Sequence, residues 1–188
     1  MRIPAQFPQS PGVLYVTYSH VLQSGILAIA KDNTFTATGY SPMDRKLTTI
    51  LAADVVGYSA LMEADEAGTH ERLKSSRKEL FEPEIARHHG RVFKLMGDGL
   101  LAEFGSVVDA VECAVSLQRG LAERNAHVPA DQRIQVRIGI NLGEVIVEGD
   151  DRYGEGVNIA ARLEQLADPG GICVSAKVAK EVEAGDGV

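Results

Sequence analysis

Residues 91–104 read Arg91-Val-Phe-Lys-Leu-Met-Gly-Asp-Gly-Leu-Leu-Ala-Glu-Phe104, with an apolar run on each side of Gly97-Asp98-Gly99. Glycine on both sides of an aspartate permits the positive φ angles of a tight hairpin turn. The stretch therefore predicts two antiparallel strands with Asp98 at the turn. Since Asp-Gly is also the commonest short hairpin signal, this acid alone does not indicate a functional site.

A second acid ends another apolar run, Leu47-Thr-Thr-Ile-Leu-Ala-Ala-Asp54, which passes through Val55-Val-Gly57-Tyr-Ser59 into a polar helical pattern. A strand that enters a helix through a glycine-containing loop favours an anion, because loop N–H groups and the helix N-terminus attract phosphate. Asp54 would hold the cation that accompanies the phosphate. Two carboxylates about 4 Å apart repel by a few kcal/mol at an effective dielectric near 20. A divalent ion such as Mg²⁺ removes that conflict.

Composition bounds the class of protein. A chain of 188 residues, 45% hydrophobic and 24% charged, suits one globular domain. The formal charge of −7 argues against a non-specific nucleic-acid binder, although it permits a nucleotide site. Cys113 and Cys173 form no CxxC or metal pattern, so we expect buried free thiols and a cytoplasmic location. No segment has the ~20 apolar residues of a membrane span, and none resembles a signal peptide.

The remaining pattern predicts an α+β fold. We expect strands at residues 46–54, 91–96, 99–104, 134–140, 145–147 and 172–175, with a turn at 141–144, and helices at 59–89 (broken near Gly68 and kinked at Pro83), 107–125, 157–167 and 176–184. This order is a ferredoxin-like βαββαβ antiparallel sheet with helices on one face, extended by a further hairpin and helices. In that plan the turn at Asp98 lies beside the end of the first strand, so Asp54 and Asp98 converge.

Residues 1–43 differ from this domain, which we place at residues 44–188. The first part contains four of the seven prolines, at Pro4, Pro8, Pro11 and Pro42. Two short strands are conceivable there, at residues 13–18 and 25–30. A small extension, a partner-binding strand pair, or residues upstream of a true start at Met43 all remain open.

A second group of polar residues follows the Gly-rich loop at residues 149–156. Asn158 and Arg162 are four residues apart on the predicted helix and share a face. Arg162 could neutralise a transferring phosphoryl group, while Asn158 could orient a sugar or phosphate oxygen. The alternative is a surface arginine paired with Glu155 or Glu164. Lys94 lies in a predicted strand, where an isolated lysine usually faces solvent.

Four ordered motifs carry a family resemblance: Ala53-Asp54-Val-Val-Gly-Tyr-Ser59, Phe93-Lys-Leu-Met-Gly-Asp-Gly99, Arg137-Ile-Gly-Ile-Asn-Leu-Gly-Glu144 and Asp151-Arg-Tyr-Gly-Glu-Gly-Val-Asn-Ile-Ala-Ala-Arg162. From about Arg45 to Val182 the chain resembles a class III nucleotidyl cyclase catalytic domain of the bacterial adenylate cyclase type. Four motifs in order are far more specific than any one of them.

The resemblance implies a function and a set of site residues. It implies a lyase that converts ATP into 3′,5′-cyclic AMP and pyrophosphate for signal transduction. The implied roles are two Mg²⁺ or Mn²⁺ ions on Asp54 and Asp98, adenine recognition by Lys94 and Asp151, ribose and transition-state contacts from Asn158 and Arg162, and phosphate contacts from the loop residues Val55, Val56, Gly57, Tyr58 and Ser59. Guanylate cyclases typically carry Glu and Cys at the positions of Lys94 and Asp151, so ATP is implied over GTP.

The resemblance also implies a homodimer with composite sites. The two aspartates come from one chain and the other four side chains from its partner, so a monomer should be inactive. The family domain normally continues with another strand pair that carries a lysine for the triphosphate, so we expect a chain truncated at its C-terminus. The main rival is a catalytically idle, cyclase-like domain for dimerisation or nucleotide sensing. A diguanylate cyclase would show a Gly-Gly-Asp/Glu-Glu-Phe-like turn instead of Met96-Gly-Asp-Gly.

Overall fold

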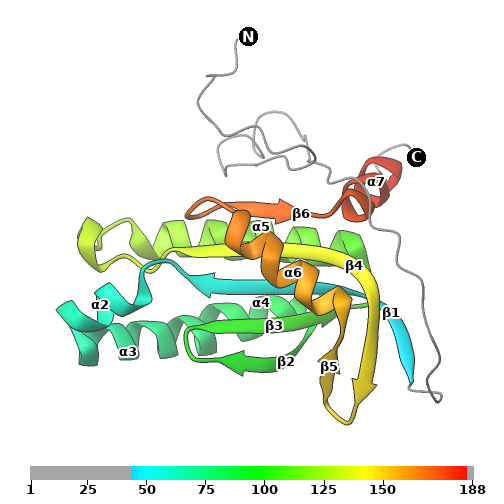
Figure 1. Ribbon diagram of the computed structural model, residues 1–188. Helices are drawn as coiled ribbons and strands as arrows, with labels where there is room; N and C mark the ends of the chain where they lie inside the picture. Colours follow the sequence, from blue (N-terminus) through cyan, green and yellow to red (C-terminus); the bar gives the residue numbers. More distant parts are fainter. Residues whose placement is uncertain (1–43, 186–188) are drawn as a thin grey trace.

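The computed structural model describes residues 44–185, which form one six-stranded sheet with helices around it (Figure 1). The strands are β1 (Arg45–Val55), β2 (Arg91–Met96), β3 (Gly99–Phe104), β4 (Val136–Glu148), β5 (Asp151–Tyr153) and β6 (Ile172–Val174). The helical segments are α2 (Tyr58–Ala64), α3 (Glu66–Ser76), the π-helical η1 (Arg77–Phe81), α4 (Glu82–Arg87), α5 (Val107–Asn125), the 3-10 turn η2 (Ala130–Gln132), α6 (Glu155–Leu166) and α7 (Ala176–Gly185). The predicted α+β class is confirmed, and the strand pair suggested within residues 1–43 lies outside the described residues.

The sheet has the spatial order β2-β3-β1-β4-β5, and β6 pairs with β4. All pairings are antiparallel except that of β4 with β6, which is parallel. The central strand β1 pairs with β3 on one side and β4 on the other, so that Ala53 lies opposite Leu100 and Asp54 opposite Arg137. This register fixes which side chains surround the end of β1.

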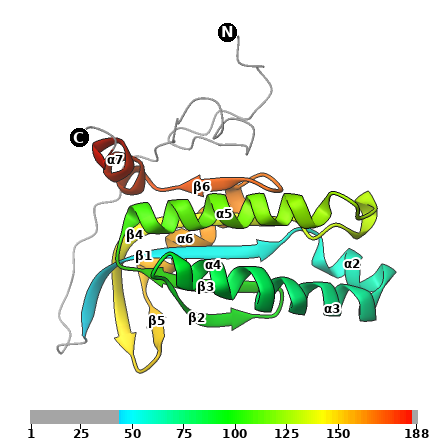
Figure 2. The ribbon, with the colours of Figure 1, turned by 180° about the vertical axis from the view of Figure 1, so that it is seen from behind.

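Helices cover both faces of the sheet, so the prediction of helices on one face is wrong. Leu51 and Ala53 pack in the core that contains α5, whereas their neighbours Ile50 and Ala52 pack in a separate core with α6. Figures 1 and 2 show α6 and α5 on opposite sides. Successive residues of β1 point to opposite faces of the sheet, and both faces are apolar. Each face is therefore buried by packing against a helix.

The predicted helix over residues 59–89 is divided into several segments. The break predicted near Gly68 lies at Asp65, because the Asp65 carboxylate accepts a hydrogen bond from the Gly68 N–H at 2.9 Å and caps α3. Pro83 lies in the first turn of α4, a position that proline favours. The wider π-helical turn of η1 directly precedes it.

The predicted turn at residues 141–144 is also wrong, because β4 runs through it without interruption. Leu142 and Gly143 pair with β1, opposite Thr49 and Thr48. Asn141 is buried and donates a hydrogen bond to the Gly156 carbonyl at 3.0 Å. The hairpin turn lies instead at Gly149, whose φ is +58°, and leads into β5. The second hairpin therefore exists, but farther along the chain than its turn-like composition indicates.

Two further expectations can be compared with the described residues. Cys113 and Cys173 are buried and free, as predicted. Within residues 44–185, no helix is long and apolar enough to cross a membrane.

Candidate functional site

The end of β1 and the turn between β2 and β3 bring Asp54 and Asp98 together. Pairing of β1 with β3 places Gly99 beside Asp54. A Cβ atom on Gly99 would lie 3.0 Å from both the Asp54 Oδ1 and the Ala53 carbonyl oxygen, so glycine lets the turn approach closely. Gly97 has a φ of +55°, which suits the tight turn that presents Asp98.

The two carboxylates oppose each other electrostatically. The pKa of Asp54 is raised, first by burial and then by the negative charge of Asp98. Arg137 acts in the opposite sense and lowers that pKa. Arg137 faces Asp54 across the β1–β4 pair, and sequence reasoning quoted it only as part of a motif.

Glu164 is a third acid near this pair, and sequence reasoning missed its position. Its residue is 7% exposed on α6, and its pKa is raised to about 7 by burial first and by Asp54 second. The interpretation that Glu164 pairs with Arg162 at the surface is wrong, because Glu164 is buried and forms no ion pair within 4.0 Å among residues 44–185. The available signal was its spacing of four residues from Ala160, which is fully buried on the same helix.

The acids make a minimal cation site. Within residues 44–185, no group of three or more His, Cys, Asp or Glu side chains is arranged to hold a metal ion. Asp54 and Asp98 supply two carboxylates in repulsive contact, which a divalent cation would relieve. Mg²⁺ commonly binds one or two carboxylates and takes its other ligands from water and substrate phosphates. The donor set therefore fits a metal that is shared with a phosphate substrate.

The loop after Asp54 lies next to the acids, but part of its backbone is already used. The Val56 N–H donates to the Gln135 carbonyl at 2.9 Å, so it is committed within the chain. Gly57 has a φ of +65° and begins α2 without a side-chain cap. Tyr58 and Ser59 occupy the first turn of α2, and Val55 ends β1.

Lys94 and Asp151 form a direct ion pair, although they are far apart in sequence. The Lys94 Nζ lies 2.9 Å from an Asp151 carboxylate oxygen and 5.1 Å from the centre of the Tyr153 ring. The hydrogen bond from Lys94, followed by one from Tyr153, lowers the pKa of Asp151 to about 2. Lys94 is therefore part of a defined polar pair at the β2–β5 contact, which an isolated solvent-facing lysine would not be.

A buried ion pair braces the strand that carries Asp151. The guanidinium of the next residue, Arg152, donates to both Glu103 carboxylate oxygens, at 2.8 and 2.9 Å, and to the Asp151 carbonyl at 2.8 Å. The side chains of Arg152 and Glu103 are only 8% and 9% exposed. Arg91 joins the same carboxylate at 3.1 Å. β5 is thus tied to β3 beside the Lys94–Asp151 pair.

Glu103→Gln should lower the free energy of unfolding by about 3 kcal/mol, because it leaves the buried Arg152 without its counter-charge. Chemical denaturation followed by circular dichroism measures this. The matched control is Asp150→Asn, which removes a carboxylate that is 99% exposed from its pair with Arg91. The control should leave the unfolding midpoint unchanged, and equal effects of the two variants would contradict a special role for the buried pair.

Because Glu164 is buried, we expect the free energy of unfolding to depend on pH in protein that is free of divalent ions. Its pKa rises from the usual 4.5 to about 7 on folding, so the folded chain binds more protons across that interval and stability falls as pH rises. The loss should be on the order of 1–3 kcal/mol and complete above pH ~7. Glu164→Gln should flatten the curve between these limits. An unchanged slope in the variant would show that another group carries it.

Asn158 and Arg162 are not bonded to the acids within residues 44–185 of one chain. Both are exposed on α6, and no hydrogen bond or ion pair joins either of them to Asp54 or Asp98 among the described residues. Within one chain, the exposed Asn158–Arg162 face therefore remains available for contacts of its own.

The comparisons with known proteins agree on one family. Residues 42–186 match the family described as the adenylate and guanylate cyclase catalytic domain. A Rhizobium meliloti protein named "Putative adenylate cyclase 3" is 56% identical over 131 residues, which are 70% of this chain and 22% of that protein. An adenylate cyclase of Streptomyces coelicolor is 31% identical over 145 residues, 74% of this chain and 35% of that protein. The matched residues thus span 22% and 35% of the lengths of these two relatives.

Solved structures show the same fold. An adenylate/guanylate cyclase/hydrolase from Silicibacter pomeroyi has a TM-score of 0.71 and 44% identity, covering 75% of this chain and 82% of its own. The guanylyl cyclase Cya2 has a TM-score of 0.64 and 29% identity, covering 74% and 79%. Proteins similar to this chain therefore include both nucleotide specificities.

Proposed function

Because this chain belongs to the adenylate and guanylate cyclase catalytic-domain family, we propose that it converts ATP into 3′,5′-cyclic AMP and pyrophosphate. The observation that supports the choice of ATP is the Lys94–Asp151 pair, a donor beside an acceptor at 2.9 Å. The 6-amino group of adenine is a donor that suits Asp151, and the N1 atom is an acceptor that suits Lys94. Guanine presents the reverse pattern and would meet mismatched groups.

Asp54 and Asp98 would hold two Mg²⁺ or Mn²⁺ ions. When bound, such ions lower the pKa of an attacking hydroxyl, here the ribose 3′-hydroxyl, and neutralise phosphate charge. The chain's own part is to keep the two carboxylates close. Gly99 permits the close approach of the turn, and the raised pKa of Asp54 reflects the nearby charge of Asp98. Arg137 lies beside them as a permanent cation, which suits charge on the departing pyrophosphate.

Arg162 and Asn158 would complete the site from a second copy of the chain. Their exposure on α6, with no hydrogen bond or ion pair to either acid within the described residues, supports a site shared between two protomers. In such a head-to-tail homodimer, Asn158 would orient the ribose and Arg162 would stabilise charge on the α-phosphate in the transition state. Each protomer would contribute the acids to one site and the other side chains to the second.

Complementation tests the shared site. Asp98→Ala and Arg162→Ala chains should each be inactive alone, and an equal mixture should recover about a quarter of wild-type activity per chain, since half of the dimers are mixed and one of their two sites is intact. Differently tagged chains report whether mixed dimers form. Mixed dimers that stay inactive would contradict the shared site.

A further inference from the structure

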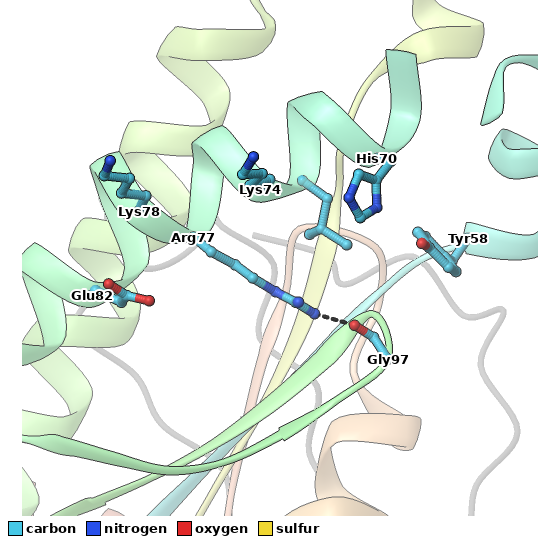
Figure 3. Close-up of a pocket in the computed structure, with 8 residues that line it drawn as sticks. Tyr58, His70, Lys74, Arg77, Lys78, Glu82 and Gly97 are labelled. Atoms are coloured by element: carbon cyan, nitrogen blue, oxygen red, sulfur yellow. Dashed lines mark hydrogen bonds between the residues drawn. The ribbon is translucent and has the colours of Figure 1, made fainter. Parts of the chain in front are cut away.

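A cavity of about 450 Å³ lies between the α3–η1 segment and the β2–β3 turn (Figure 3). Its floor touches the turn at Gly97, directly before Asp98. Figure 3 shows Arg77 reaching across to Gly97, with Tyr58 and His70 at one end of the cavity and Lys78 and Glu82 at the other. The lining residues are Tyr58, His70, Leu73, Lys74, Arg77, Lys78, Glu82 and Gly97.

The cavity concentrates positive charge in a chain whose formal net charge is −7. Lys74, Arg77 and Lys78 are cations, His70 is titratable, and Glu82 is the single acid of the lining. The spacing of positions 70, 74, 77 and 78 places these side chains on one face of the helical segment. A π-helical turn, a feature often found at functional sites, begins at Arg77.

Neither Lys74 nor Lys78 forms an ion pair within 4.0 Å among residues 44–185, and both side chains are exposed, so their ammonium groups are available to a ligand. Lys78 has only a weak electrostatic contact with Glu79, whose carboxylate is hydrogen-bonded to Arg124. Carboxylates do partner eight other cations of residues 44–185: Arg45, Lys46, Arg72, Arg87, Arg91, Lys94, Arg124 and Arg152. Two unpaired ammonium groups along one cavity favour a multiply charged anion.

We propose that this cavity binds a phosphate-type polyanion through Lys74, Lys78 and Arg77. Lysine and arginine are the usual partners of phosphate oxygens, and charge-assisted hydrogen bonds are the strong ones. The volume is within the range of small-molecule sites. The source is either the phosphates of the bound nucleotide or a separate phosphorylated effector.

The same contacts couple the cavity to the turn. Arg77 donates a hydrogen bond to the Gly97 carbonyl, and Gly97 holds the positive φ that presents Asp98. An anion that draws the guanidinium away removes this tether from the turn. The effect on turnover rests on the proposed cyclase function, whereas anion binding stands without it.

Calorimetric titration of inorganic pyrophosphate into the full chain, dialysed free of divalent ions, tests the binding. Lys74→Gln combined with Lys78→Gln should weaken pyrophosphate binding about tenfold or more, equivalent to ~1.4 kcal/mol. The matched control is Lys177→Gln with Lys180→Gln on α7, which removes the same charge from two exposed positions. Equal affinity of the wild type and the Lys74/Lys78 variant, or equal weakening by the control, would overturn the proposal.

A second titration with a non-hydrolysable ATP analogue identifies the source. If the Lys74/Lys78 variant weakens analogue and pyrophosphate binding by similar factors, the nucleotide's phosphates occupy the cavity. If only pyrophosphate binding weakens, the cavity takes a separate anion. Neither titration depends on catalysis. The binding result can therefore be interpreted even if the chain shows no cyclase activity.

Discussion

Asp54→Asn and Asp98→Asn should each reduce cyclase activity by about 10³-fold or more. An amide in place of either carboxylate keeps the size but loses the charge that would hold the divalent ion. Metal-based charge stabilisation is worth several kcal/mol in such sites, and each 1.36 kcal/mol changes a rate about tenfold. Initial rates of product formation with saturating ATP and Mn²⁺ measure the loss.

The same variants should not lose stability, which separates a catalytic role from a structural one. The pKa of Asp54 is raised by burial and by Asp98, so its charge opposes folding and Asp54→Asn should raise the unfolding midpoint at neutral pH in metal-free protein. Asp131→Asn, in the exposed turn η2, is the matched control for both measurements. An Asp54→Asn protein that keeps more than a tenth of its activity would contradict the metal site.

Lys94→Glu combined with Asp151→Cys should shift the ATP-to-GTP ratio of kcat/KM toward GTP by about 10²–10⁴-fold. A site built to hydrogen-bond one base edge rejects the reversed edge strongly, because buried polar groups are left unpaired. The exchange replaces the donor Lys94 by an acceptor and the acceptor Asp151 by a weak donor. Each single exchange should lower ATP use without creating equal GTP use.

Competition between ATP and GTP in one reaction, with both cyclic products quantified, measures this ratio directly. Lys177→Glu on α7 is the control for the charge reversal at Lys94, and it should leave the ratio unchanged. Full ATP selectivity in the double variant would show that Lys94 and Asp151 do not read the base. The tether of β5 through Arg152 and Glu103 remains in the variant, so the strand should stay in place.

Much of the acid pair's position follows from sequence. Gly97-Asp98-Gly99 predicts the hairpin, and the βαββαβ order places that turn at the end of the first strand. The structure has this register, with Ala53 opposite Leu100. The turn residues and the strand order were sufficient to predict that Asp54 and Asp98 lie close together, because the hairpin strand β3 pairs directly with β1.

Other features depend on contacts that local pattern does not contain. Asn141-Leu-Gly-Glu has the composition of a turn, yet pairing with β1 and the Asn141 bond to Gly156 keep it extended. The Glu103–Arg152 pair joins residues 49 apart, and the burial of Glu164 depends on the close packing of α6 on Gly139. A Cβ at Gly139 would lie 2.2 Å from the Ala160 carbonyl oxygen. These contacts join residues that are distant in sequence, so they become apparent only in the folded structure.

The most direct measurement is product formation from ATP and from GTP by the full chain with Mn²⁺ at high protein concentration, beside Asp98→Ala. The proposed function predicts cyclic AMP as the main product, a rate per chain that rises with protein concentration, and no product from Asp98→Ala. Cyclic GMP as the main product would contradict the base assignment. Cyclic AMP formed equally well by Asp98→Ala would contradict the two-acid site.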